Sequence, residues 1–186
     1  MKNSKKSTGI NIFILSLSVL SMSACSLFSP APELSDAESC VKLNAIIADH
    51  SHDFQQFKKS RVSSIGVVNM QIWKAKKVFP RANNCQVWEW STGLTSYMCT
   101  WQEKGGAVEA KASHDHGVEV VRQCLNEQWT SDTLTTKSGG VRTRFTQVNG
   151  KTIIAINAFK ESRTILENWK TTLYVGDKSN LNAEVQ

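Results

Sequence analysis

Two short stretches hold all four histidines of the 186-residue chain, and both have the spacing of a metal chelate. The first, "HSHD", contains His50 and His52, and the second, "SHDHG", contains His114 and His116. A His-x-His pair chelates well on a strand, where residues two apart point the same way, but on a helix these positions lie about 200° apart. Whether a metal site can form therefore depends on the elements that carry the histidines.

The first histidine pair falls on a helix that we expect over residues 36–58. Ser35-Asp36-Ala37-Glu38 is a capping box, which satisfies free amides at the start of a helix. Apolar residues then recur at helical spacing, and the stripe passes through residue 50: Cys40, Leu43, Ile47, Phe54 and Phe57. We expect His50 on this stripe and His52 on the opposite side, so this pair cannot hold one metal ion.

The second pair begins another expected helix, over residues 114–128, with Ser113 as its cap. Its apolar side consists of Val118, Val121, Cys124 and Leu125. The backbone is freer at a helix start, and His116 lies near His50 if the two helices are neighbours. The candidate metal ligands are therefore His50, His114 and His116. The simpler interpretation, a boundary His50 with the other histidines solvated, is favoured because zinc sites show tighter spacing and a supporting carboxylate.

Catalytic signatures are missing from the sequence. It has no Gly-x-Ser-x-Gly elbow, no His-Glu-x-x-His, no phosphate-binding loop and no dinucleotide fingerprint. The cysteines are better explained as disulfide partners than as nucleophiles. We therefore expect no enzymatic activity and no cofactor.

The N-terminus predicts export. Lys2, Lys5 and Lys6 precede an apolar run, Ile10 to Met22, that is too short to span a bilayer. Its end, Met22-Ser23-Ala24-Cys25, resembles the lipobox of bacterial lipoproteins. The resemblance implies removal of residues 1–24, a diacylglyceryl thioether on Cys25 and an acylated (palmitate-type) amino group. With Ser26 after the cysteine, it implies sorting to the outer membrane of a Gram-negative cell. The alternative is an ordinary signal peptide that leaves Cys25 free.

The remaining chain divides into a tether and one domain. Residues 25–34 contain Pro30 and Pro32, which favour an extended tether. Residues 35–176 are enough for a single periplasmic domain, and residues 177–186 form a polar tail. The net charge of +6 includes the three leader lysines, so the mature chain carries 6 − 3 = +3. This value and the absence of a basic stripe argue against nucleic acid as a partner.

Strand signals dominate the rest of the domain. Val67 to Trp73 predicts a strand, and "CQVWEWSTGLTSYMCTW" predicts a hairpin around Thr92-Gly93. A two-residue turn there places five residues on one face, which we take as the core face: Trp88, Trp90, Tyr97, Cys99 and Trp101. A second hairpin turns at Asn149-Gly150, and a last strand includes Trp169 to Val175. The fold class is α+β, an antiparallel sheet with two main helices in the order α-β-β-β-α-β-β-β.

Four cysteines besides Cys25 predict two disulfide bonds in an oxidising compartment. Packing of the second helix on the aromatic face favours Cys99–Cys124, which leaves Cys40 for Cys85. The rival pairing, Cys85–Cys99, needs a three-residue turn, which would divide the aromatic face.

One basic cluster remains: Lys74, Lys76, Lys77 and Arg81. It either contacts anionic headgroups or an acidic partner, or it is a solvated strand edge protected by lysines. These features together predict an outer-membrane lipoprotein that faces the periplasm and acts by protein–protein contact. It would be an accessory or assembly factor of the envelope, or an inhibitor or immunity protein. The alternative function is a metal-binding or ligand-binding periplasmic lipoprotein that uses the histidines.

Overall fold

A computed structural model describes residues 36–62, 69–76, 82, 84–102, 105–161 and 168–178, all within one compact unit over residues 33–186. The expected leader, the lipobox and the tether lie outside the described residues, as do Lys77 and Arg81. The elements in chain order are α1 (Asp36–Asp49), a 3₁₀ helix η1 (His50–His52), β1 (Lys58–Val62), β2 (Met70–Ala75), β3 (Asn84–Trp90), β4 (Thr95–Gln102), α2 (Ala107–Cys124), β5 (Trp129–Thr135), β6 (Val141–Gln147), β7 (Thr152–Lys160) and β8 (Trp169–Asp177).

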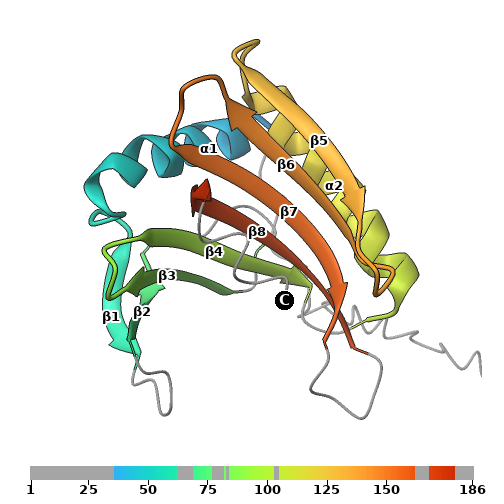
Figure 1. The fold of residues 1–186 in the computed structure, drawn as a ribbon, viewed down its shortest axis with the longest axis horizontal. Coiled ribbons are helices and arrows are strands. Elements are labelled where there is room, and N and C mark those ends of the chain that lie inside the picture. The colour runs from blue at the N-terminus through green and yellow to red at the C-terminus, as the bar shows by residue number, and fades with distance from the viewer. Residues whose placement is uncertain are drawn as a thin grey trace, which may run out of the picture. The chain divides into compact units, whose positions relative to one another are not determined.

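The eight strands of the described residues form one antiparallel sheet in the order β1-β2-β3-β4-β8-β7-β6-β5 (Figure 1). The α+β class is confirmed, but each helix is followed by four strands instead of three. The two halves meet at the central β4–β8 pair. This strand order is the one that a twofold axis between β4 and β8 would give for two α-β-β-β-β halves.

The two additional strands are the edge strands of the sheet. β1 has the sequence KKSRV and begins at residue 58, where a helix was expected to end. β5 has the sequence WTSDTLT and is mostly exposed. Neither strand alternates apolar and polar residues, because an edge strand buries little of either face. Hydrophobic periodicity therefore could not indicate these two strands.

Both helices pack on the same face of the sheet, which we call the helix face. Leu43 and Ile46 from α1 and Val118 and Val121 from α2 enter the core there. The turn after η1 adds Phe54 and Phe57, and the strands supply the rest of this cluster: Cys85, Val87, Tyr97, Cys99, Phe145, Ile154, Ile156, Leu173 and Val175. The opposite side, which we call the open face, has a smaller buried cluster: Ile153, Ala155 and Tyr174, with Met98 packed against it.

α1 ends at Asp49, earlier than expected, because the chain turns sharply after it. Asp53 and Phe54 both have φ = 54°, in the left-handed region that side chains other than glycine rarely adopt. Phe54 is fully buried, and its ring stacks on His50 at a centroid distance of 5.2 Å. Burial of this aromatic side chain stabilises a turn that its backbone alone would not favour.

α2 begins seven residues before the expected start, because Ala107, Ala110 and Ala112 are strong helix formers. It ends at Cys124, since Leu125 is extended. Gly117 lets α2 approach β4 closely: a Cβ atom at this position would lie 2.0 Å from the Trp101 ring. A glycine within a helix costs about 1 kcal/mol relative to alanine, and here it makes room for a tryptophan.

The β3–β4 hairpin has a three-residue turn, Ser91 to Gly93, and the expected two-residue turn is wrong. The Trp90 amide donates to the Leu94 carbonyl at 2.9 Å, and Gly93 has φ = 82°. Trp88 consequently pairs with Ser96 instead of Tyr97. The expected aromatic face is therefore divided: Trp88 and Trp90 lie on the open face, whereas Tyr97, Cys99 and Trp101 lie on the helix face with Cys85 and Val87.

The second hairpin and the last strand are confirmed. Thr146 pairs with Ile153, which centres the β6–β7 turn on Asn149 and Gly150. Asn149 lies in the left-handed region, with φ = 61°, and the Gly150 amide donates to the Gln147 carbonyl at 3.0 Å. β8 extends two residues past the expected Val175 and ends at Asp177.

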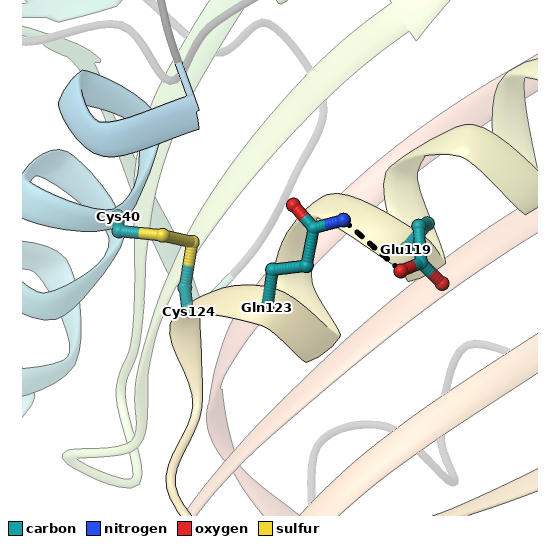
Figure 2. The surroundings of a disulfide bond; sticks show 4 residues. All are labelled: Cys40, Glu119, Gln123 and Cys124. Carbon is teal, nitrogen blue, oxygen red and sulfur yellow. Dashed lines mark hydrogen bonds between the residues drawn. A yellow bond between two sulfur atoms is a disulfide. The ribbon is translucent and has the colours of Figure 1, made fainter.

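The disulfide bonds are Cys40–Cys124 and Cys85–Cys99, so the preferred pairing is wrong and the rival hairpin pairing is correct. The three-residue turn places Cys85 directly opposite Cys99, with 4.1 Å between their Cα atoms. Cys40 near the start of α1 is bonded to the last residue of α2 (Figure 2). In the same view Gln123 donates to Glu119 one turn earlier.

The two bonds close loops of very different length, with sequence separations of 84 and 14 between their cysteines. Loop-closure entropy predicts a loss of about 4.5 kcal/mol for a Cys40→Ala/Cys124→Ala variant and about 3 kcal/mol for Cys85→Ala/Cys99→Ala. Urea unfolding of both variants measures the difference, after peptide mapping of the unreduced chain has verified the pairing. An equal loss, or the reverse order, would contradict the loop-length argument.

Candidate functional site

The two histidines of "HSHD" point in different directions, as expected. His50 is 8% exposed, whereas the His52 side chain is 73% exposed. His50 Nδ1 lies 2.6 Å from Thr152 Oγ1, and its Nε2 lies 3.4 Å from Asp177 Oδ2. Both ring nitrogens of His50 are therefore occupied by the first residue of β7 and the last residue of β8. His50 attaches the turn after α1 to the end of the sheet.

Asp177, His50 and Thr152 have the residue types of a hydrolytic triad, but the resemblance is limited to those types. A nucleophile needs donors placed where negative charge develops on the substrate. The Thr95 amide donates to Asp177 Oδ2 at 3.4 Å. The group therefore acts as a structural connection between η1, β4, β7 and β8.

His114 is also a structural residue. It is buried in the middle of α2, not solvated at a helix start as expected. Its Nε2 lies 3.1 Å from Thr143 Oγ1 on β6, and its Nδ1 lies 2.9 Å from Asp115 Oδ1. A buried imidazole needs partners for both nitrogens, and here a strand hydroxyl and a neighbouring carboxylate provide them.

The four histidines all lie within the described residues, so the metal hypothesis can be compared with their positions. Among these residues, no group of three or more His, Cys, Asp or Glu side chains is placed to hold a metal ion. His50 is hydrogen-bonded to residues of β7 and β8, whereas His114 is hydrogen-bonded to a residue of β6. His116 is exposed on α2. The geometry thus does not favour a histidine metal site.

The open face has a different character, because two tryptophans lie there side by side. Trp88 and Trp90 are partly exposed, and their ring centroids are 5.9 Å apart. Ile72 pairs with Trp88, and Met70 pairs with Trp90, on the adjacent strand β2. All four side chains are half-buried. We call these residues, Met70, Ile72, Trp88 and Trp90, the tryptophan patch.

The other half of the open face carries arginines. Arg144 on β6 donates from Nε and Nη2 to Asp132 Oδ2, at 3.1 and 2.8 Å. Arg142 is 9% exposed, and its Nε donates to Asn157 Oδ1 at 2.7 Å. A hollow of about 130 Å³ lies beside Arg144, lined by Asp132, Arg144, Thr146, Ile153 and Lys178. The open face is therefore apolar at the tryptophan patch on β2 and β3 and polar over β5 and β6.

Trp88 and Trp90 were expected in the core because the shorter hairpin turn was assumed. The signal that would have corrected it was the cysteine spacing. Cys85 and Cys99 are opposite each other only if the turn has three residues. With that register, the alternation along β3 sends Trp88 and Trp90 away from the buried Val87.

The expected basic cluster is only partly within the described residues. Lys74 and Lys76 are exposed, at the end of β2. β2 is an inner strand, with β1 as the edge beside it. The interpretation of Lys74 as protection of a sheet edge is therefore wrong, whereas contact with an anionic surface or partner stays a prediction.

Comparison with known proteins gives no relative: no family model, no curated protein and no solved structure matches the chain. Within the described residues, neither helix has the length and apolar character needed to cross a membrane. The functional argument therefore rests on the site itself.

The structural role of His50 gives a prediction with a matched control from the same motif. His50→Ala removes two side-chain contacts and the stacking on Phe54, so we expect a loss of about 2–3 kcal/mol in the free energy of unfolding. His52→Ala, at an exposed position, should change it by less than about 0.5 kcal/mol. Urea unfolding at neutral pH compares the two variants. Equal losses would show that His50 does not hold the turn.

Proposed function

We propose that this protein is an outer-membrane lipoprotein that faces the periplasm and acts by protein–protein contact, without catalysis. The observation that carries the proposal is the tryptophan patch, a partly exposed apolar cluster on the face opposite the helices. Tryptophan is among the residues most enriched at the centres of protein interfaces, and a contiguous exposed apolar patch on a stable domain indicates a binding surface.

The compartment is supported by two independent features. The lipobox-like Met22-Ser23-Ala24-Cys25 implies export and lipid attachment. The disulfide bonds of the folded domain fit an oxidising environment, because such bonds are rare in the reducing cytosol. Several acyl chains on one cysteine would anchor the domain almost permanently, whereas a single chain binds membranes only marginally.

Two kinds of partner agree with this arrangement. An envelope machine would use the protein as an accessory or assembly factor held at the membrane. A toxin delivered to the periplasm would be neutralised by it as an inhibitor or immunity protein. Both roles need a rigid recognition surface, and a patch built on two adjacent strands provides one.

Anchoring is tested by substitution of the lipobox cysteine. Cys25→Ser should abolish metabolic labelling with a palmitate analogue and release the chain from the outer-membrane fraction into the soluble periplasm. Ser26→Ala, beside it, should retain both labelling and membrane location. Labelled, membrane-bound Cys25→Ser protein would contradict lipid attachment at this residue.

Binding through the patch is tested by photo-crosslinking in intact cells. A benzoylphenylalanine in place of Trp90 should give one discrete crosslinked species, because the patch is expected to be buried by the partner. The same residue in place of Glu119, exposed on α2 on the opposite side of the sheet, should not. The added substitution Ile72→Asp should weaken the Trp90 crosslink, since a charge in a desolvated contact is costly.

The outcome that contradicts this part of the proposal is equally specific. If position 90 gives no discrete species, or the same species as position 119, the tryptophan patch is not the binding surface. Thermal unfolding of the Ile72→Asp variant verifies that it is folded, so that a weaker crosslink is not caused by misfolding.

A further inference from the structure

β5 is the outermost strand at one end of the sheet, and its free edge carries little protection (Figure 1). Its sequence, WTSDTLT, contains no lysine, arginine or proline, and its residues are mostly exposed. Natural sheets usually block such edges with charges, proline or a bulge, because unpaired backbone groups recruit further strands. The β5–β6 pairing is regular over seven residue pairs, with no bulge.

The hydrogen bonding of the β5–β6 hairpin shows which backbone groups point outward. The Thr136 amide donates to the Gly140 carbonyl at 2.8 Å, which makes this a hydrogen-bonded pair. Such pairs alternate along an antiparallel ladder. Ser131, Thr133 and Thr135 are therefore non-hydrogen-bonded positions toward β6, and they direct their amides and carbonyls to the free edge. No described residue outside β6 pairs with them.

The opposite edge of the sheet is protected. β1 carries exposed Lys59 and Arg61, and its register shifts between Lys58 and Arg61 as at a bulge. Both features are means by which sheets avoid edge-to-edge pairing. The chain thus has one guarded edge and one edge that is open among the described residues.

We propose that the β5 edge pairs with the β5 edge of a second copy of this chain, giving one continuous sheet across a twofold axis. An antiparallel register centred on Thr133 pairs Thr133 with its own copy and Ser131 with Thr135 of the second copy. All of these residues direct their backbone groups outward, as a hydrogen-bonded ladder requires. The same register keeps each Asp132 away from its symmetry mate and beside Leu134.

Charge and topology both favour a second copy as the occupant. The carboxylate of Asp132, the only charge on β5, accepts two hydrogen bonds from Arg144, so two β5 edges meet without strong repulsion. Because the β1 edge is protected, the association uses the one edge that is open among the described residues, and it closes as a dimer instead of continuing as a fibre. α2 packs mainly over β7 and β8, so β5 is accessible beyond it.

Site-specific crosslinking of the purified full chain in detergent tests the pairing. Thr133→Cys should give a dimer with a short bismaleimide, because hydrogen-bonded cross-strand positions lie about 5.5 Å apart. Lys59→Cys is also at an exposed position, but on the protected β1 edge, so its yield of crosslinked dimer should equal that of the unsubstituted chain. The unsubstituted chain measures any background crosslinking through Cys25. Dimer from both variants in equal yield, or from neither, overturns the proposal.

A second pair of variants tests whether the β5 backbone makes the contact. Ser131→Pro removes an outward amide, whereas Ser131→Ala keeps it. On a Thr133→Cys background, the proline variant should weaken dimerisation about thirtyfold relative to the alanine variant, since the twofold axis removes two hydrogen bonds at once. Circular dichroism verifies that both remain folded. Equal dimerisation of the two folded variants overturns strand pairing through β5.

These outcomes are independent of the tryptophan patch and of Cys25. Purified chain that stays monomeric overturns self-pairing even if residue 133 crosslinks to another protein in cells, a result that would assign the edge to a foreign strand. A missing Trp90 crosslink, in contrast, leaves the dimer result unchanged.

Discussion

The register of the β3–β4 hairpin is the constraint on which the arrangement of the site depends. Gly93 closes a three-residue turn with a positive φ, and the Cys85–Cys99 bond fixes the strands in that register. A shift of one residue would exchange every side chain of one strand between the two faces. The turn therefore decides that Tyr97 fills the core while Trp88 lies on the open face.

The same register explains why the two halves of the sheet differ in chemistry. Each half is a helix followed by four strands, and β4 and β8 join the halves at the centre. On the open face the first half presents the tryptophan patch, whereas the second presents Arg142 and Arg144. On the helix face both halves are apolar, because both contribute to one continuous core. The halves thus share their strand arrangement, whereas their open faces differ in chemistry.

Much of the architecture could be predicted from the sequence, since its signals are local. Apolar spacing indicated both helices, and Asn149-Gly150 indicated the second hairpin. The expected cap Ser113 is wrong, because this residue lies inside α2, and the expected cap at residue 35 lies outside the described residues. The edge strands could not be predicted, because exposed polar strands have no periodicity. The disulfide pairing was wrong because it followed from an assumed turn length, and the buried state of His114 depends on Thr143, a contact across 29 residues. Errors in the candidate site therefore came from one misjudged turn and from a tertiary contact between residues distant in the sequence.

Strand pairing at β5 has a geometric consequence for recognition through the tryptophan patch. A twofold axis perpendicular to the sheet keeps both open faces on the same side, so a dimer presents two patches together. Eleven strand intervals separate the two copies of β3 in such a sheet, which corresponds to roughly 50 Å at the usual strand spacing. Two identical sites at a fixed separation gain avidity only for a partner that repeats. A symmetric envelope assembly would offer such repeated sites to the proposed dimer, whereas a single toxin molecule would not.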